Sequence, residues 1–205
     1  MVSERERQLS KSAHMSRLAA IGATAALAAG TVLVAAPAAQ ARPISLKTNY
    51  ACETVLGDQA MKVTIKMDLP AKVKRGSKVK ARPVNMTVVV PESLVTPMRD
   101  ILGITALSGS ASAIKYSVGS QKIPLSKVKI PLTTVPDSGS MTLKAKGVAN
   151  GFKAPKKPGT YTVRIPKSFT FNANNQDGDP VPSSPFPCSV PSGSPTKLGT
   201  LKVVR

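Results

Sequence analysis

The feature that most constrains this chain is an alternation of apolar and polar side chains with a period of two. Between Met61 and Leu69 every second residue is apolar, the residues between carry lysine, threonine or aspartate, and Pro70 follows. Successive side chains of a β-strand point to opposite faces, so this spacing predicts a strand with one buried face. A helix would spread the same apolar residues around its whole circumference.

The same alternation recurs in eight further runs. Their predicted inward positions are Ile44, Leu46, Thr48, Tyr50 and Cys52; Val84, Met86, Val88 and Val90; Ile114, Tyr116 and Val118; Val128, Ile130 and Leu132; Met141, Leu143 and Ala145; Tyr161, Val163 and Ile165; Phe169 and Phe171; Leu201 and Val203. Turn sequences separate them, namely Arg75-Gly76-Ser77, Asp137-Ser138-Gly139, Asn150-Gly151, Pro158-Gly159 and Asp177-Gly178. Many short strands with such turns predict an all-β sandwich or barrel.

Two segments depart from this alternation. A helical face is predicted where apolar residues are spaced three and four apart, with Thr96 as cap before Pro97 and Gly103 as the end. The residues of that face are Leu94, Val95, Met98, Ile101 and Leu102. We therefore expect one short helix crossing between strands. Residues 180–195 hold six prolines and five serines, which predicts an irregular loop.

The first 41 residues have the three parts of a secretory signal peptide in the expected order. The cations Arg5, Arg7, Lys11 and Arg17 come first; Met15 is an alternative start. An uncharged stretch over residues 18–36 follows, Pro37 breaks it, and Ala39-Gln40-Ala41 is a small-x-small cleavage site. A membrane anchor of about 20 residues is the alternative, but alanine contributes little to insertion. We expect a secreted single domain of residues 42–205.

Both cysteines, Cys52 and Cys188, lie in this predicted mature chain. An even number of cysteines in an exported protein is most simply one disulfide, while two free thiols are the alternative. Cleavage removes few cations, so the mature chain keeps 25 of 29 cationic and 8 of 10 acidic residues and a net charge of +17.

The residue inventory argues against catalysis, and we predict no enzyme activity, no cofactor and no metal. The single histidine, His14, falls in the signal peptide, which excludes Ser-His and Cys-His pairs and histidine-rich zinc sites. Four Ser-x-x-Lys spacings are weak evidence, because about two are expected by chance in a chain so rich in both residues, and the companion motifs are absent. The oxygen-rich stretch 172–179 could suit Ca²⁺, but a plain turn explains it equally well.

The strongest candidate binding feature is a run of cations. It consists of Lys72, Lys74, Arg75, Lys78, Lys80 and Arg82, and a second cluster consists of Lys153, Lys156 and Lys157. Such lysines either solvate the surface and protect strand edges, or attract anionic cell-wall polymers and lipid head groups. Nucleic acid is the less favoured polyanion, because the mature chain has 19 lysines against 6 arginines and few aromatic residues for stacking.

A set of short segments, taken in order, carries a resemblance. They are Asn49-Tyr50-Ala51-Cys52, Asp68-Leu69-Pro70, Val73-Lys74-Arg75-Gly76-Ser77, Leu102-Gly103, Ser108-Gly109-Ser110, Thr134-Val135-Pro136-Asp137-Ser138-Gly139, Pro158-Gly159-Thr160-Tyr161-Thr162-Val163 and Phe186-Pro187-Cys188. Their order resembles an actinobacterial secreted family of unknown function over most of residues 48–188. The resemblance implies an immunoglobulin-like β-sandwich with a Cys52–Cys188 bridge, and it implies no activity and no functional residues. This chain departs from the family in its richness in lysine.

The resulting expectation is a secreted, noncatalytic basic domain that adheres to anionic cell-envelope polymers. A structural or cell-surface domain with no ligand of its own is the alternative, and an enzyme of unrecognised type is a third reading.

Overall fold

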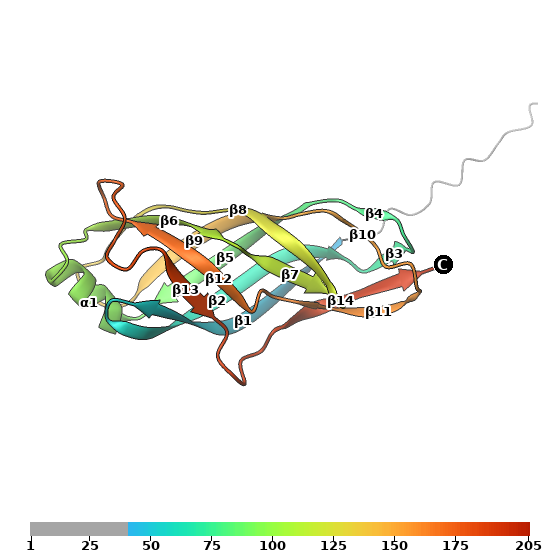
Figure 1. Cartoon of the computed structure of the whole chain (residues 1–205), viewed down its shortest axis with the longest axis horizontal. Coiled ribbons are helices and arrows are strands. Elements are labelled where there is room, and N and C mark those ends of the chain that lie inside the picture. Colours follow the sequence, from blue (N-terminus) through green and yellow to red (C-terminus); the bar gives the residue numbers. More distant parts are fainter. Residues whose placement is uncertain (1–40) are drawn as a thin grey trace, which may run out of the picture. The chain divides into compact units, whose positions relative to one another are not determined.

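The computed structural model describes residues 41–205, so the predicted signal peptide lies outside the described residues except for Ala41. The described part contains fourteen strands and one helix (Figure 1). The strands are β1 (Ala41–Thr54), β2 (Gly57–Pro70), β3 (Lys72–Lys74), β4 (Lys78–Val79), β5 (Arg82–Val90), β6 (Ala106–Ser112), β7 (Lys115–Val118), β8 (Gln121–Thr134), β9 (Met141–Ala149), β10 (Phe152–Lys153), β11 (Gly159–Arg164), β12 (Ser168–Asn174), β13 (Phe186–Ser189) and β14 (Lys197–Val204). The helix is α1 (Glu92–Asp100). The prediction of an all-β fold with one short helix is confirmed.

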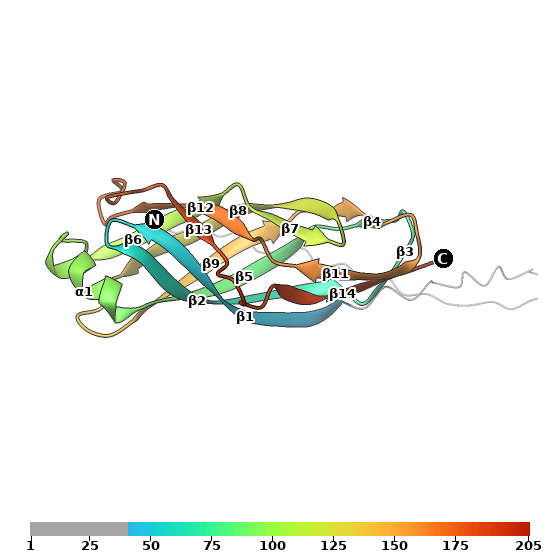
Figure 2. The same cartoon turned by 60° about the horizontal axis from the view of Figure 1, so that its bottom comes forward.

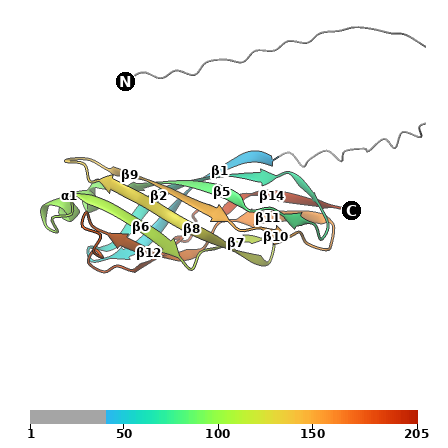
Figure 3. The same cartoon turned by 90° about the horizontal axis from the view of Figure 1, so that it is seen from above.

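Eight of these strands close into a ring, which is an antiparallel barrel. Their order is β1, β2, β5, β9, β8, β6, β12 and β13, and β13 pairs again with β1. The closing contact is the pairing of β8 with β9, and Figure 3 shows β8 between β9 and β6. In the predicted immunoglobulin-like sandwich, two sheets face each other and no hydrogen-bonded strand pair joins them. The observed fold differs from that prediction, because the β8–β9 pair closes the ring.

A local irregularity in β8 allows this closure. Lys127 adopts a positive φ of 55°, and the β8–β9 register shifts between Ser126 and Lys129. Such a bulge bends a strand, so β8 turns onto β9 while it also pairs with β6. The strands approach closely, since a Cβ on Gly147 would lie 2.7 Å from Cγ2 of Val128.

Four further strands extend β8 into a second layer. The first residues of β8 pair with β7, and the order continues through β11 and β14 to β3, while β4 and β10 form a separate two-stranded sheet. Figure 2 shows β14 beside β1. Gly199 of β14 faces Ile44 and Leu69, and the Arg42 guanidinium donates to the Thr200 carbonyl at 3.4 Å. This end of the domain therefore has two packed layers, whereas the other end is the closed ring.

The apolar positions of the alternating runs form one continuous core. In β2, Met61, Val63, Ile65, Met67 and Leu69 are all buried. Leu132 of β8 is an exception, because 58% of it is exposed. The β6–β8 register shifts between Leu107 and Gly109, and this extra residue in β8 reverses the alternation before Leu132. The expectation that Leu132 points inward is therefore wrong.

The helix was predicted to start at Pro97, and this start is wrong. Helix α1 begins at Glu92 after Pro91, and Pro97 lies inside it. An acidic residue in the first turn favours this start, because it faces the positive end of the helix dipole. The last helical residue is Asp100, three residues before the predicted end at Gly103, which has φ +65° and donates its N–H to the Arg99 carbonyl in the turn that follows the helix.

The face of α1 also differs from the prediction at one position. Leu94, Val95 and Met98 are buried as expected, but Ile101 follows the last helical residue and is 76% exposed. No helix of residues 41–205 is long and apolar enough to cross a membrane.

The predicted disulfide is present. Cys52 and Cys188 are bonded, and they face each other across the β1–β13 pair. The loop predicted over residues 180–195 needs a correction, because residues 186–189 form β13 in its middle. Within β13, Phe186 and Cys188 are buried and Pro187 and Ser189 are exposed, which is the alternation of a strand.

Candidate polyanion-binding site

Strand β3 carries the first two of the predicted cations. It pairs in parallel with β14, the last strand of the second layer, so that Lys72 lies opposite Lys202 and Lys74 opposite Val204. Val73 between them is half-buried against the core, while Lys72, Lys74 and Lys202 are exposed. The alternation of β3 therefore directs both of its lysines to solvent.

The turn after β3 is closed by hydrogen bonds to the backbone. The Ser77 hydroxyl donates to the Lys74 carbonyl at 2.6 Å, and Gly76 adopts a φ of +65°, which favours glycine. The Arg75 N–H donates to the Val204 carbonyl at 2.9 Å. These bonds hold exposed Arg75 beside the end of β14, where Arg205 follows.

A second short sheet joins the two predicted lysine clusters. Strands β4 and β10 pair so that Lys78 lies opposite Lys153 and buried Val79 lies opposite Phe152. The strands approach at Gly151, where a Cβ would lie 2.7 Å from the Val79 carbonyl oxygen. Only glycine fits there without a backbone shift, so this residue sets the spacing between the two clusters.

Arg82 differs from the other predicted site residues. It begins β5, is only half exposed, and its Nε is buried without a hydrogen-bond partner among the described residues. The other five predicted cations are exposed.

The resulting surface is named the basic end, and it comprises residues 72–82, 152–158 and 202–205. It gathers eleven cationic residues, which are Lys72, Lys74, Arg75, Lys78, Lys80, Arg82, Lys153, Lys156, Lys157, Lys202 and Arg205. None of them forms an ion pair, since the single side-chain ion pair within residues 41–205 is Arg99–Asp100. Like charges directly opposite on paired strands oppose pairing, so Lys72/Lys202 and Lys78/Lys153 cost stability.

The acidic residues gather at the α1 end of the domain, which is named the acidic end (residues 53–58, 91–105, 134–140 and 175–182). It holds seven of the eight acidic residues of residues 41–205, namely Glu53, Asp58, Glu92, Asp100, Asp137, Asp177 and Asp179, against one cation, Arg99. The Glu92 carboxylate accepts the Gly139 N–H at 3.0 Å, and the Gln176 amide oxygen accepts the Thr105 N–H at 3.2 Å. These bonds join α1 and the segment after it to the β8–β9 and β12–β13 loops.

The oxygen-rich stretch considered for calcium folds as a turn. The Asn175 side-chain oxygen accepts the N–H groups of Asp177 at 3.0 Å and Asp179 at 2.9 Å. The Gly178 N–H donates to the Asn175 carbonyl. No group of three or more histidine, cysteine or acidic side chains is placed to hold a metal within the described residues.

Sequence reasoning did not include Lys202 and Arg205 in the site. Alternation around Leu201 and Val203 does direct Lys202 outward, but nothing in a linear pattern indicates that the last strand pairs with β3. The β4–β10 pairing that merges the two predicted clusters is equally long-range.

Comparison with known proteins shows the family of this chain. A family model described as "Family of unknown function (DUF6801)" matches residues 49–199, and the chain belongs to this family. No curated protein and no solved structure matches the chain. The match agrees with the resemblance to a domain of unknown function and adds no functional residue.

Proposed function

We propose that this member of the DUF6801 family is an exported, noncatalytic domain whose basic end adheres to anionic polymers of the cell envelope. The observation that carries the proposal is the unpaired charge of the basic end. Eleven cations lie there without an ion-pair partner, and two pairs of lysines are directly opposed across strands. Lys129 and Lys146 are opposed in the same way on β8 and β9, so the distinguishing feature of the basic end is its density of cations, with no acidic residue in residues 72–82, 152–158 and 202–205.

Charge separation supports adhesion in one orientation. The acidic end is repelled by an anionic polymer while the basic end is attracted, so the domain would dock with α1 pointing away. A surface that served solubility alone would need no such separation, because mixed charges keep proteins soluble equally well.

Export is supported by the sequence and by the disulfide. Bridges of this kind persist in oxidising compartments and are rare in the reducing cytosol. The Cys52–Cys188 bond is therefore in keeping with the predicted signal peptide, and it favours a partner outside the membrane.

Sedimentation with purified cell walls across a salt series tests the proposal, using protein recovered after expression of the complete chain. The variant K72Q/K74Q/K78Q/K80Q removes four exposed charges from the basic end. Its matched control, K62Q/K66Q/K144Q/K146Q, removes four exposed charges from the outer face of β2 and β9. Both variants have the same net charge, so only position differs.

We expect the basic-end variant to bind walls about tenfold more weakly at low salt and with a shallower salt dependence, by analogy with counterion release at other polyanions. The control should retain most of its binding. An equal loss in both variants would show that net charge and not the basic end governs adhesion. Binding to anionic lipid vesicles but not to walls would assign the partner to lipid head groups.

A further inference from the structure

One edge of strand β1 has no hydrogen-bonded partner strand over most of its length. Along its other edge β1 pairs with β2 from Ala41 to Thr54 without a register shift. On the open side β13 pairs only with Ala51 and Cys52, and no other strand of residues 41–205 pairs with β1. The open stretch comprises residues 43–50 and is named the β1 edge.

Strand β13 shows which backbone groups of β1 face this side. Val190, which follows β13, donates its N–H at 2.9 Å to the carbonyl of Lys167, just before β12. Bonding direction alternates along an antiparallel strand, so the groups of the preceding residue, Ser189, point to β1 and bond to Ala51. The N–H and C=O groups of Ala51 therefore face away from β2.

The same orientation holds for every second residue before Ala51, because the pairing of β1 with β2 is regular. These residues are Asn49, Lys47 and Ser45. Their N–H and C=O groups have no hydrogen-bond partner among residues 41–205. All three residues are exposed, so an extended segment added at this edge can pair with them.

The chain's own strands do not occupy the β1 edge. Pro191 would have to continue β13 along β1, but it has no N–H to donate. Strand β14 packs on the face of β1 instead of pairing with it, since a Cβ on Gly199 would lie 3.4 Å from Cδ1 of Ile44. The Arg42 guanidinium, which donates to the Thr200 carbonyl, joins the two strands beyond the open stretch.

The outward-facing side chains around the β1 edge are basic. Lys47 lies at its centre, and Lys66 and Lys62 lie opposite Ser45 and Asn49 on β2. All three lysines are exposed, and none forms an ion pair with another described residue. Opposite charges on neighbouring strands stabilise a sheet, so acidic side chains are favoured beside them.

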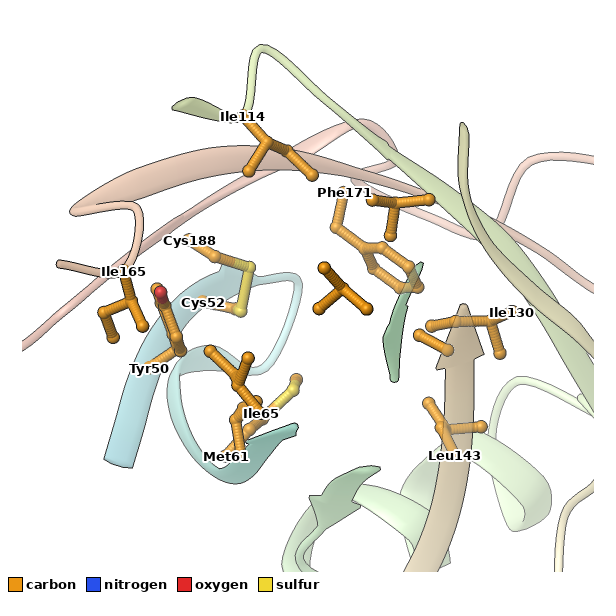
Figure 4. Packing of buried hydrophobic residues seen from close by; sticks show 14 of the residues in the cluster. Tyr50, Cys52, Met61, Ile65, Ile114, Ile130, Leu143, Ile165, Phe171 and Cys188 are labelled. Atoms are coloured by element: carbon orange, nitrogen blue, oxygen red, sulfur yellow. A yellow bond between two sulfur atoms is a disulfide. The ribbon is translucent and has the colours of Figure 1, made fainter. Parts of the chain in front are cut away.

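The inward-facing side chains of the same stretch are apolar except for one hydroxyl. Figure 4 shows Tyr50 and Cys52 of β1 directed into the core. By alternation Ile44 and Leu46 lie on this face, and both are half-buried against the core. Thr48 is 5% exposed, and its Oγ1 has no hydrogen-bond partner among residues 41–205. Apolar side chains and a threonine therefore suit this side, since threonines pair well across strands.

We propose that the β1 edge binds an extended segment of another protein, in which acidic residues alternate with apolar residues and threonine. The segment lies antiparallel to β1, in line with β13. A second copy of this chain fits less well, because a two-fold pairing centred on Lys47 places like charges opposite each other. Pro43 and Lys47 discourage such self-pairing, whereas an acidic segment neutralises the lysine. This proposal is independent of adhesion at the basic end.

Amide hydrogen exchange, resolved by NMR, tests the proposal on the folded protein recovered from the complete chain. The probe is the end-blocked peptide Val-Glu-Thr-Glu-Val-Glu-Val, whose central glutamate lies opposite Lys47. Saturating peptide should slow exchange of the Ser45, Lys47 and Asn49 N–H groups at least about tenfold, because each enters a hydrogen bond. The N–H groups of Leu46 and Thr48 already bond to β2 and should not change. Peptide held only at the basic end would leave all five unchanged and overturn the proposal.

Two N-methylated peptides test whether the backbone is the site of contact. Methylation of the central glutamate removes an N–H that faces β1 and should weaken binding about tenfold. Methylation of the valine that follows removes an N–H that faces solvent and should leave binding unchanged. Equal binding of the two peptides would overturn strand addition.

A pair of charge-reversed variants tests the preference for an acidic segment. K47E should weaken binding of the probe about tenfold and favour a peptide with lysine in place of glutamate. K144E, on the exposed outer face of β9, has the same net charge and should bind as the unaltered protein does. Equal weakening in both would overturn the acidic preference. Slow exchange of the Ser45, Lys47 and Asn49 amides without peptide would overturn the whole proposal, and would assign the edge to a second copy if it increased with protein concentration.

Discussion

The two ends of the domain use their charged side chains differently. At the acidic end Glu92, Arg99 and Asp100 make structural contacts. Glu92 accepts the Gly139 N–H at 3.0 Å, and Arg99 donates to the Pro136 carbonyl at 2.8 Å while it pairs with Asp100. At the basic end the lysines make no such contacts, and the strands are held by backbone hydrogen bonds and by buried Val79.

This difference separates charges that build the fold from charges that are free to bind. A side chain already engaged in a hydrogen bond must break it before it meets a ligand, whereas an exposed lysine pays only the entropy of being ordered. The exposed lysines of the basic end are therefore available to a ligand, whereas Glu92, Arg99 and Asp100 of the acidic end already serve as a framework.

The largest effect on the free energy of unfolding should come from removing the Cys52–Cys188 disulfide near the acidic end. Cys52 lies two residues before Thr54, the end of β1, and its bond to Cys188 holds β13 there. The bridge spans 136 residues of sequence, so C52A/C188A should lower the free energy of unfolding by up to about 5 kcal/mol through the greater freedom of the unfolded chain.

Urea unfolding, with the unaltered protein under reducing conditions as the control, measures this loss. Wall adhesion of the fraction that remains folded should persist, because the basic end is not touched. A variant as stable as the unaltered protein would mean that backbone pairing alone fixes β13 on β1.

A smaller loss is expected at the basic end from a change that removes no charge. The Cβ of G151A would lie 2.7 Å from the Val79 carbonyl oxygen, so β4 and β10 must separate, at a cost of about 1–3 kcal/mol. G199A is the matched control, because its Cβ would meet Ile44 at an ordinary 3.4 Å. Urea unfolding and wall sedimentation should show lower stability and weaker adhesion for G151A only. If both variants behave alike, this contact does not set the lysine spacing.

The sequence predicts strand faces well, because alternation is a local property. Tyr50, Ile65 and Leu143 are buried as their spacing indicates. It does not predict ring closure, since the β8–β9 seam depends on a positive φ at Lys127, a residue that ordinarily avoids this conformation. The same bulged strand accounts for the wrong assignment of Leu132.

The candidate site could likewise be predicted from the sequence only in part. The cluster from Lys72 to Lys80 is contiguous, so its exposure could be predicted from residue type and alternation. Lys153 and Lys202 lie beside this cluster only because strands that are far apart in the sequence pair with each other. A hollow of about 90 Å³ among the core side chains of the ring was not predicted at all, because a void is a property of packed volumes and leaves no pattern along the chain.

The smallest expected effects are changes in the free energy of unfolding, and they should have opposite signs at the two ends. K78Q removes one member of the opposed Lys78/Lys153 pair and should raise the free energy of unfolding by about 0.3 kcal/mol at low salt. D100N removes a carboxylate at the acidic end, where the Arg99 guanidinium holds the pKa of Asp100 below its usual range. The stability from this pair is present above the ordinary aspartate pKa and is lost as pH falls through the lowered value, so D100N should lower stability slightly at neutral pH and not in strong acid. Both groups are exposed, so added salt should shrink both effects. Thermal unfolding at low and high salt measures the two variants side by side. Equal signs would contradict the two local assignments, because loss of the repulsive Lys78/Lys153 pair must stabilise the domain and loss of the attractive Arg99–Asp100 pair must destabilise it.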